Sequence, residues 1–567
     1  MIGLISATAA GAAARDRLAA AWPDRTRVYE GPVGEAVRSA FSECEQLVCF
    51  LATGATVRLL APLLAGKAAD PGVVCVDEGG RFAVSLVGGH GGGANELARE
   101  VGELLGAEPV VTTATDAVGL AGLDTLGLPC EGAVAAVSRA LLDGEPVALD
   151  AESTWPLPPL PVSPRGSYTI RLTDRDVEPG PREVLLRPPS LVVGVGASKG
   201  APVDEVFGLI EETLREAGLS PRSVAELATV DAKSEEPGIL GAAGRLGVPV
   251  VTYSAEELAT VEVPNPSAAP LAAVGTPSVA EAAALLGGGE LLVPKRKSDA
   301  SPAMATCAVV RRPGRGRLAV VGLGPGARDL LTPRATAELR RASVLVGLDQ
   351  YVDQIRDLLR PGTRVLESGL GAEEERARTA VEQARLGHAV ALIGSGDAGV
   401  YAMASPALAE ASDDIEVIGV PGVTAALAAA AILGAPLGHD HVSISLSDLH
   451  TPWEVIERRV RAAAEADLVV TFYNPRSRGR DWQLPKALGI LAEHRAPTTP
   501  VGVVRNASRP DGSSRVSTLA GLDPASVDMM TVVTVGNTAT RTVAGRMVTP
   551  RGYRWQNGRS EQPEETR

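Results

Sequence analysis

Short runs of valine, leucine and isoleucine alternate with helical stretches rich in alanine, glutamate and arginine along almost the whole chain. "QLVCFLA" precedes "ATVRLLAPLLAG", "SLVVGVGAS" precedes "VDEVFGLIEETLREAG", and "HAVALIGSG" precedes "YAMASPALAEA". This alternation is typical of βα units, whose helices cover the faces of a parallel sheet. It predicts an α/β fold, and the 567 residues predict several domains, because one domain holds roughly 100–200 residues.

Two stretches interrupt this alternation. Residues 151–190 hold nine prolines around the strand-like "SYTIRLTD" and predict a small irregular β module. Residues 293–317 are basic and rich in proline and glycine, and we expect them to be a connection to the motif that follows. The expected domains are 1–128 (α/β), 129–190 (proline-rich middle module), 191–312 (α/β) and 317–552 (two subdomains that divide near residue 430), followed by a polar tail without fixed structure, 553–567.

The balance of charge argues against polyanionic partners. The 54 lysines and arginines against 68 acidic residues give a net charge of −14, and only 3% of residues are aromatic. Nonspecific binding to nucleic acid or to an anionic membrane is therefore disfavoured. The first residues lack the basic and continuously apolar regions of a secretory signal, and the run "VTAALAAAAILG" is far short of the ~20 residues that span a bilayer. We expect a soluble, cytoplasmic protein.

Neither the cysteines nor the histidines form a recognisable ligand pattern. The five cysteines contain no CxxC pair, and the six histidines contain no HExxH. A disulfide framework and a protein-bound metal are therefore not expected.

The segment "LAVVGLGPGARDLL" places three glycines after an apolar run and before a helical stretch. A dinucleotide fingerprint needs GxGxxG and an acidic residue about 20 positions later. Here Gly322, Gly324 and Gly326 are spaced GxGxG. Pro325 fixes φ and removes an N–H donor, which suits a tight turn against a ligand better than a pyrophosphate cradle. The spacing disfavours a dinucleotide.

Further glycine-bearing strand ends follow this loop. In chain order they are "ALIGSGDAGVYAM", "VIGVPGVTAALAAAAILGAPLGHDHVSI", "LVVTFYNPRSRGRDW", "PVGVVRNASRPDG" and "TVVTVGNTATR". The ordered set resembles the tetrapyrrole methylases, and "GSGDAGVYAMASP" and "TFYNPRSRGRDWQL" look closest to precorrin-3B C(17)-methyltransferase of cobalamin biosynthesis. The resemblance covers about residues 317–552. It implies the two-domain class III methylase fold, S-adenosyl-L-methionine as cofactor, and methylation of a tetrapyrrole with contraction of its ring.

The resemblance also implies positions for the cofactor and the substrate. Matched by motif, the cofactor-binding residues are Pro325, Gly326, Ser395, Gly396, Asp397, Val400, Thr424, Ala425, Asn474 and Ala507. Ring contraction requires proton transfers, for which His439, Asp440, His441 and Asp448 are candidates. The alternative is that these four residues form only a turn and a helix cap. Arg476, Arg478 and Arg480 are candidates for binding the acetate and propionate arms, with a solvated role as the alternative.

The N-terminal part carries a different glycine-rich motif, "SLVGGHGGGANELAREV". It places His90 in a loop, Gly88 to Gly93, before a helix that begins near Asn95. A helix start of this kind leaves amides that could donate hydrogen bonds to a carboxylate or an oxyanion. The alternative is a purely structural turn.

This segment, with "LVVGVGASKGAPVDEVFGLIEETL", "GTPSVAEAAAL" and "VPKRKS" further on, resembles cobalt-precorrin-5A hydrolase over most of residues 1–312. The resemblance implies opening of a ring-A lactone with release of acetaldehyde. Hydrolysis needs an activated water and a stabilised oxyanion. His90 and Asp116 are candidates for the base, and no GxSxG motif supports a serine nucleophile. Candidate substrate-orienting residues are Thr53, Arg58, Gly89, Thr112, Thr113, Lys199 and Lys233.

The sequence therefore predicts a fusion of a lactone hydrolase with a ring-contracting methyltransferase. One alternative makes the N-terminal half a non-catalytic corrinoid carrier. Another makes the methylase act on RNA or on protein. The resemblance further implies a homodimer and transient contact with other corrin-pathway enzymes. Whether the pathway is the oxygen-dependent or the early-cobalt one stays open.

Overall fold

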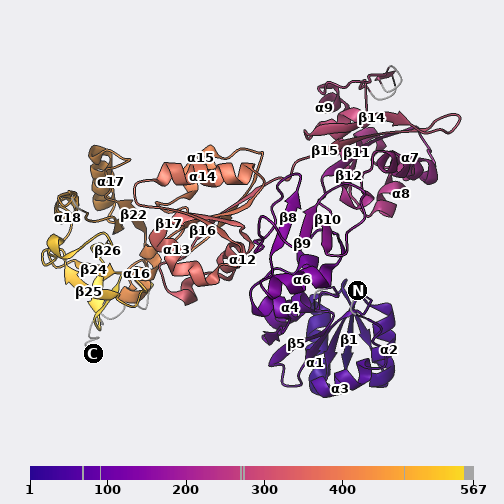
Figure 1. The fold of residues 1–567 in the computed structure, drawn as a ribbon. Coiled ribbons are helices and arrows are strands. Elements are labelled where there is room, and N and C mark those ends of the chain that lie inside the picture. Colours follow the sequence, from indigo (N-terminus) through magenta and orange to yellow (C-terminus); the bar gives the residue numbers. More distant parts are fainter. Residues whose placement is uncertain (67–68, 90, 268–270, 273–274, 478, 554–567) are drawn as a thin grey trace, which may run out of the picture. The chain divides into compact units, whose positions relative to one another are not determined.

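The computed structural model describes residues 1–66, 69–89, 91–267, 271–272, 275–477 and 479–553 (Figure 1). The chain divides into two compact units, residues 1–314 with 360–363 and residues 315–359 with 364–567. Of the predicted site residues, His90 and Arg478 lie outside the described residues, as does nearly all of the predicted tail. Each unit contains sheets with helices packed on them, so the predicted α/β class is confirmed.

The first unit begins with a six-stranded sheet, in the order β2-β1-β3-β4-β5-β6. Its strands are β1 (Ile2–Ser6), β2 (Thr26–Tyr29), β3 (Gln46–Phe50), β4 (Gly72–Val76), β5 (Phe82–Val87) and β6 (Glu108–Val110). All neighbours pair in parallel except β4 and β5, which form a hairpin. Helices α1 (Ala9–Ala21) and α4 (Ala94–Leu105) pack on one face, and α2 (Val33–Glu43) and α3 (Thr53–Leu60) on the other.

The proline-rich region forms a small sheet of its own, in the order β7-β10-β9-β8. The strands are β7 (Cys130–Gly132), β8 (Val147–Ala151), β9 (Tyr168–Leu172) and β10 (Glu183–Leu186). Helix α6 (Val134–Leu142) covers one face, where Val137 and Leu141 pack against Ile170. The prolines of residues 156–181 fall between the strands, because proline cannot donate to a strand ladder.

The third sheet has the order β13-β12-β11-β15-β14. Its strands are β11 (Leu191–Ala197), β12 (Val224–Val230), β13 (Val250–Tyr253), β14 (Glu290–Lys297) and β15 (Ala305–Arg311). Helices α7 (Val203–Glu216) and α8 (Pro237–Leu246) cover one face, and α9 (Ala255–Ala259) and α11 (Ala280–Leu285) cover the other. Residues 293–317, expected to be a connection, instead form most of the antiparallel pair β14 and β15. That expectation was wrong because the apolar run "ATCAVVR" is buried beside β11 despite its basic flanks.

The second unit contains a parallel sheet followed by a mixed one. The parallel sheet, in the order β18-β17-β19-β16-β20, consists of β16 (Arg317–Gly322), β17 (Val344–Leu348), β18 (Arg364–Ser368), β19 (Ala389–Gly394) and β20 (Glu416–Val420). Helices α12 (Pro333–Arg341) and α13 (Asp349–Ile355) cover one face, and α14 (Glu373–Arg385) and α15 (Ala404–Glu410) cover the other. The carboxyl ends of all five strands therefore meet at one edge.

The mixed sheet has the order β22-β23-β26-β24-β25. It consists of β22 (His441–Ser445), β23 (Val469–Tyr473), β24 (Pro500–Arg505), β25 (Ser513–Thr518) and β26 (Thr531–Val535). Helices α17 (Trp453–Glu465) and α18 (Gln483–Ala492) pack on one face, and the alanine-rich α16 (Ala425–Leu433) packs on the other. Three short strands, β21 (Gly434–Ala435), β27 (Arg541–Val543) and β28 (Arg546–Val548), form a separate sheet. Among the described residues, no helix is long and apolar enough to cross a membrane.

Candidate active sites of the two units

The glycine loop after β16 is bonded to the loop after β19. The amide of Gly324 donates to the carbonyl of Gly396 at 2.9 Å, and the amide of Gly396 donates back to Gly324 at 2.8 Å. A Cβ on Gly422, after β20, would meet the carbonyl oxygen of Gly396 at 2.1 Å. Only glycine allows three strand ends to approach this closely. The structure thus brings together three of the glycine motifs that the sequence analysis singled out.

Asp397 fixes the relative position of two of these loops. Its carboxylate accepts hydrogen bonds from the amide of Gly399 at 2.8 Å and from the amide of Gly422 at 3.0 Å. The first bond closes the turn that leads to Val400, and the second joins the loop after β19 to the loop after β20. Asp397 therefore holds the backbone of this edge in place, in addition to any ligand that it contacts.

Arg509 links the predicted cofactor positions of the two sheets. Its Nε donates to the carbonyl of Pro325 at 3.0 Å. A Cβ on Gly326, whose φ is +137°, would meet Cγ of Arg509 at 2.7 Å. Tyr351, on α13, is partly buried and shares a hydrogen bond with the side chain of Ser395. Burial raises the pKa of Tyr351, while the charge of Arg509 and this hydrogen bond oppose that rise. Neither Arg509 nor Tyr351 is among the residues predicted from the sequence.

Thr424, Ala425 and Asn474 are brought together by a tyrosine that the sequence analysis also missed. The hydroxyl of Tyr473, the last residue of β23, lies 2.5 Å from Oγ1 of Thr424 and accepts a 2.8 Å hydrogen bond from the amide of Ala426. Asn474 follows with φ +51° and donates to Oγ of Ser445 at 3.0 Å. Tyr473 stands directly before Asn474 in "TFYNP". Its position next to a predicted cofactor-binding residue is the sequence signal that could have identified it.

Tyr401 lies against Tyr473. The two ring centroids are 5.2 Å apart with a 57° tilt, and the hydroxyl of Tyr401 donates to the carbonyl of Ser443 at 2.7 Å. Tyr401 directly follows Val400 and has φ +52°, a left-handed conformation that is strained for a bulky side chain. The ring pair joins the loop after β19 to strands β22 and β23.

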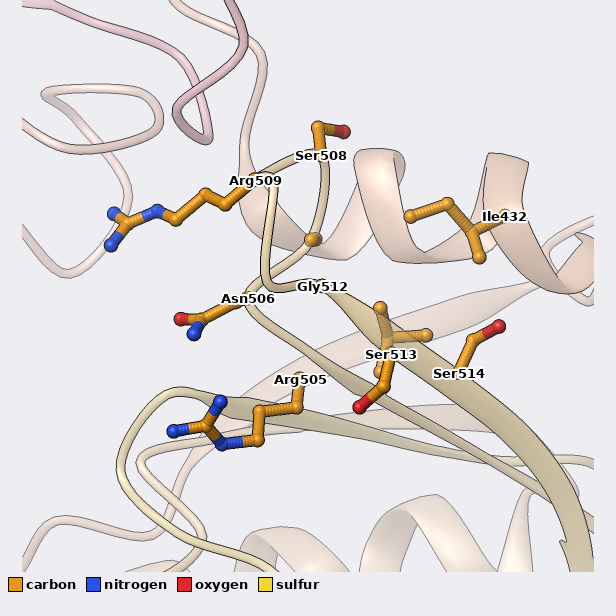
Figure 2. A pocket seen from close by; sticks show the side chains of 10 residues that line it. Ile432, Arg505, Asn506, Ser508, Arg509, Gly512, Ser513 and Ser514 are labelled. Carbon is orange, nitrogen blue, oxygen red and sulfur yellow. The ribbon is translucent and has the colours of Figure 1, made fainter.

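Ala507 lines a cavity of about 190 Å³ together with Ile432 and residues 504–509 and 512–514 (Figure 2). Asn506 and Ser508, on either side of it, have φ +49° and +63°. Figure 2 shows Asn506 and Arg509 pointing away from Ile432, so the loop presents polar groups on its other side. Asn506 is 7% exposed; its Nδ2 donates to Asp511 at 2.6 Å, and its Oδ1 lacks a partner among the described atoms.

The predicted proton-transfer residues lie at opposite ends of β22, in the mixed sheet. His439 and Asp440 precede β22 in an exposed turn, where the Asp440 amide donates to Nδ1 of His439 at 2.8 Å. His441 begins β22, whereas Ser445 ends it opposite Tyr473. A five-residue strand is about 13 Å long, so the structure does not bring His439 and Asp440 to the edge that carries Asn474. Exposed Asp448 lies beyond the carboxyl end of β22 and accepts a 3.0 Å hydrogen bond from Gln483.

The Gly88–Gly93 loop of the first unit is closed by its own hydrogen bonds. The amides of Gly92 and Ala94 both donate to the carbonyl of Gly88 at 3.1 Å, and the amide of Asn95 donates to Gly89 at 2.9 Å. These three amides are therefore engaged within the loop and its helix start. The loop also crosses the start of β4 so tightly that a Cβ on Gly72 would meet the Gly92 carbonyl oxygen at 2.1 Å.

Buried Asn95 ties this loop to the end of β6. It accepts a 2.7 Å hydrogen bond from Ser85, and its Nδ2 donates to Thr113 at 3.2 Å. Because β5 and β6 are parallel, Thr112 and Thr113 lie at the same edge as Gly89. Asp116 follows on the short helix α5 (Ala114–Ala117), and nothing is described of its side chain.

Thr53 and Arg58 lie at the other edge of this sheet. Both are on α3, which follows the carboxyl end of β3, whereas the glycine loop crosses the amino ends of β3 and β4. Arg58 donates to the carbonyl of Gly54 at 3.0 Å, and Thr53 is exposed. The structure therefore does not bring Thr53 and Arg58 together with Gly89.

Lys199 and Lys233 flank a buried carboxylate at the carboxyl ends of β11 and β12. Glu236 accepts a 3.1 Å ion-pair contact from Lys233 and a 2.7 Å hydrogen bond from the amide of Gly200. Burial alone would raise the pKa of Glu236, but these donors and the charge of Lys199 hold it below its ordinary value. Glu236 thus brings the two predicted lysines to one place.

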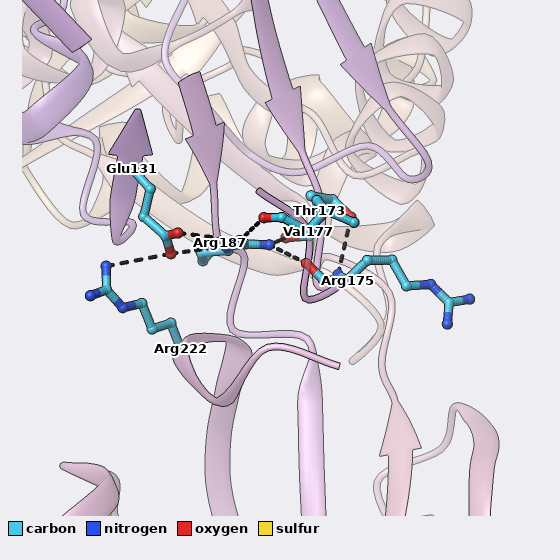
Figure 3. A network of polar contacts seen from close by, with 6 residues as sticks. All are labelled: Glu131, Thr173, Arg175, Val177, Arg187 and Arg222. Atoms are coloured by element: carbon cyan, nitrogen blue, oxygen red, sulfur yellow. Dashed lines mark hydrogen bonds and ion pairs between the residues drawn. The ribbon is translucent and has the colours of Figure 1, made fainter. Parts of the chain in front are cut away.

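A fully buried arginine holds together the part of the middle sheet that pairs with the third sheet through Glu131 (Figure 3). Arg187 is 1% exposed. Its Nε pairs with Glu131 at 3.0 Å, and its other nitrogens donate to the carbonyls of Thr173, Arg175 and Val177. Glu131 also pairs with Arg222, which precedes β12, at 3.4 Å.

Asp174 and Arg311 add a second connection between these sheets. Both guanidinium contacts are short, 2.6 and 2.7 Å, and the Asp174 side chain also accepts from Ser190 at 2.8 Å. This bidentate geometry is the strong form of a carboxylate–guanidinium pair.

Three parts of the chain match known families. Residues 317–523 match the family described as tetrapyrrole (corrin/porphyrin) methylases. Residues 35–116 match the cobalamin synthesis G N-terminal family, and residues 191–310 match the cobalamin synthesis G C-terminus family.

Named relatives share the methylase part. The chain is 47% identical over 239 residues to a probable cobalt-factor III C(17)-methyltransferase of Salmonella typhimurium, covering 42% of this chain and 99% of that protein. It is 41% identical over 260 residues to a cobalt-factor III methyltransferase of Priestia megaterium, covering 44% of this chain and 48%, or about half, of that protein. The crystal structure of the methyltransferase CobJ is 42% identical and is covered completely by 41% of this chain, with a TM-score of 0.40. The chain belongs to the tetrapyrrole methylase family, and it carries the two cobalamin synthesis G domains ahead of the methylase.

Proposed function

We propose that this chain is a bifunctional enzyme of corrin ring biosynthesis. Its second unit methylates C-17 of precorrin-3B or cobalt-factor III and contracts the ring, with S-adenosyl-L-methionine as methyl donor. Its first unit opens the lactone of cobalt-precorrin-5A and releases acetaldehyde. The observation that carries the methylase part is the 47% identity over nearly the whole length of a relative named for C(17) methylation of cobalt-factor III.

The residues at the strand ends of the second unit fit the proposed cofactor. The amides of Gly324 and Gly396 are engaged with each other's carbonyls, but those carbonyls and the Asp397 carboxylate keep further lone pairs that can accept hydrogen bonds from a ligand. The unpaired, buried Oδ1 of Asn506, next to Ala507, can accept a hydrogen bond from an amine or hydroxyl of a ligand. This set of acceptors suits the hydroxyl and amino groups of S-adenosylmethionine.

Methyl transfer depends mainly on positioning. The cofactor supplies an electrophilic methyl group, and the acceptor carbon must lie in line with it in a site that excludes water. In our proposal the Tyr473 bonds to Thr424 and Ala426 hold the start of α16, and the Arg509 bond to Pro325 holds the glycine loop. Arg476 and Arg478 bind carboxylate arms of the substrate. Asp448, beyond the carboxyl end of β22, is better placed for proton transfer than His439 or Asp440, which precede that strand.

For the first unit we propose that lactone opening takes place at the edge formed by Gly89, Thr112 and Thr113. His90 and Asp116 are the candidate bases, since His90 follows Gly89 and Asp116 stands three residues after Thr113 in the sequence. Because the amides of Gly92, Ala94 and Asn95 are engaged, the oxyanion would be met by threonine hydroxyls rather than by those amides. Lys199 and Lys233 are proposed to orient the polycarboxylate.

Mass spectrometry of products after incubation with S-adenosylmethionine and precorrin-3B or cobalt-factor III tests the methylase. We expect the mass gain of one methyl group and formation of S-adenosylhomocysteine. Copurification of RNA with no reaction of any tetrapyrrole would instead support a nucleic-acid methylase.

Acetaldehyde release from cobalt-precorrin-5A tests the hydrolase. We expect release by the unaltered chain and its loss in His90→Ala or Asp116→Asn. Release that both variants retain would overturn these base assignments, and binding of the substrate without release would favour a carrier. Homodimerisation, contact with other corrin-pathway enzymes and a cytoplasmic location stay predictions.

A further inference from the structure

Tyr401 joins the loop after β19 to the mixed sheet through two contacts. Its hydroxyl donates to the carbonyl of Ser443, on β22, at 2.7 Å, and its ring centroid lies 5.2 Å from that of Tyr473, on β23. We refer to these two contacts as the Tyr401 clasp. Because Tyr401 follows Val400 and Tyr473 precedes Asn474, the clasp connects two segments that carry predicted cofactor-binding residues.

The Tyr401 clasp is carried by a short segment that is anchored at both ends. Ala398 and Met403 are 4% and 6% exposed and pack into the core of the parallel sheet. Residues 399–402, between these anchors, are partly or fully exposed, and Tyr401 supplies their hydrogen bond and ring contact to the mixed sheet. A movement that breaks the clasp can therefore be confined to these residues and leave both sheets intact.

Two properties make the Tyr401 clasp easy to break. Tyr401 has φ +52°, a conformation that costs a bulky residue free energy and that surrounding contacts have to offset. Its side chain is 54% exposed, so little apolar burial would be lost if its ring left Tyr473. Tyr473 is held on its other side by Thr424 and the amide of Ala426. Tyr401 is therefore the partner of the pair that can move.

We propose that Tyr401 gates the cofactor site: the Tyr401 clasp is closed during methyl transfer and opens to exchange S-adenosylhomocysteine for a new S-adenosylmethionine. Methyl transfer needs a site that excludes water, whereas every turnover needs the cofactor to enter and its product to leave. A strained, half-exposed contact between two predicted cofactor segments meets both requirements. The inference rests on the proposed methylase function and concerns the exchange of its cofactor, whatever the methyl acceptor is.

Surface plasmon resonance with the immobilised full chain, and with S-adenosylhomocysteine as the probe, measures association and dissociation rates. Tyr401→Phe loses the hydroxyl bond that keeps the clasp closed and should raise both rates about twofold to tenfold. The dissociation constant should change by less than about twofold, because opening precedes both entry and release. Tyr401→Gly removes the ring and accepts the positive φ, so it should raise both rates at least as much. Tyr29→Phe loses a hydroxyl bond to Glu43 in the first unit and is the matched control, with no expected change.

The two rates together separate gating from a role in the binding surface. A dissociation rate that rises alone, with weaker affinity, would mean that Tyr401 only supports the bound cofactor, and the inference would be wrong. Unchanged rates in both variants would also overturn it, even if a tetrapyrrole is methylated, and so would the absence of S-adenosylhomocysteine binding to the unaltered chain. Conversely, faster exchange in the variants of a chain that methylates no tetrapyrrole would sustain the inference while the proposed function fails.

Discussion

The hydroxyl of Tyr473 lies 2.5 Å from Oγ1 of Thr424 and accepts a 2.8 Å hydrogen bond from the Ala426 amide. One phenol thereby joins the last residue of β23 to the first turn of α16. Because Thr424 and Ala425 are predicted cofactor positions, a change at Tyr473 should act on the cofactor through the backbone that Tyr473 holds.

Tyr473→Phe should weaken S-adenosylhomocysteine binding to the full chain by about twofold to tenfold, because a net hydrogen bond contributes about 0.5–1.5 kcal/mol. Isothermal calorimetry measures the affinity. Tyr253→Phe, on β13 of the first unit, is the matched control and should leave the affinity unchanged. Equal affinities in the two variants would contradict a positioning role for Tyr473.

Gly72→Ala should destabilise the six-stranded sheet by about 3 kcal/mol or more, because its Cβ would meet a main-chain oxygen that no rotamer change can move. Hydrogen exchange of the peptides from β3, β4 and the Gly88–Gly93 loop reports the loss. Gly34→Ala, on α2, makes only an ordinary 3.6 Å contact and should leave this exchange unchanged. If hydrogen exchange of these peptides stays slow in Gly72→Ala, the close approach of the Gly92 carbonyl oxygen to Gly72 would be contradicted.

Arg187→Met should lower the free energy of unfolding of the first unit by about 3–5 kcal/mol, because it leaves the carboxylate of Glu131 and three backbone carbonyls without their buried donor. Urea unfolding, monitored through hydrogen exchange of the β9 and β10 peptides, measures this loss in the free energy of unfolding. Arg222→Met removes a 61% exposed partner of the same carboxylate and should cost less than about 1 kcal/mol. Similar costs for the two variants would refute the central role of Arg187.

Glu338→Gln should make the second unit less stable at neutral pH and less sensitive to acid. Hydrogen bonds from Arg317 hold the pKa of Glu338 below its ordinary value, although burial opposes this. A lowered folded pKa contributes stability above the ordinary glutamate value of about 4.3, and that stability is lost as the pH falls through the folded pKa. The expected loss at pH 7 is about 1.5–3 kcal/mol.

Calorimetric unfolding temperatures measured between pH 7 and pH 3 check this linkage. The stability lost by the unaltered chain should exceed that lost by Glu338→Gln, and the two should converge at low pH. Glu382→Gln, an exposed position on α14, should follow the unaltered chain throughout. Parallel curves for all three proteins would rule out a contribution from the Arg317 pair.

The period of the apolar pattern and the chain order of the glycine motifs were sufficient to predict the fold class. Runs such as "LAVVG" and "AVALIG" are continuously apolar because helices cover both of their faces, and Gly324, Gly396 and Gly422 meet because parallel strands end at one edge. Local sequence determines these features, which is why they could be predicted.

Features set by distant contacts could not be predicted. His439 and Asp440 stand next to a strand in sequence, but only the direction of β22 decides which edge they reach. The free or engaged state of the Gly92 and Ala94 amides depends on how the loop turns back on Gly88. Tyr401 packs against Tyr473, 72 positions away, and Arg509 donates a hydrogen bond to Pro325, 184 positions away. No local pattern reports such pairs.

The two charge pairs that join the middle sheet to the third sheet determine where the first unit can be divided. A fragment that ends at Ser190 would expose Asp174 without Arg311 and would separate Glu131 from Arg222. A break before residue 129 crosses neither pair. Exchange of modules with related proteins, by recombination or by design, is therefore best carried out with residues 129–312 inherited as one piece.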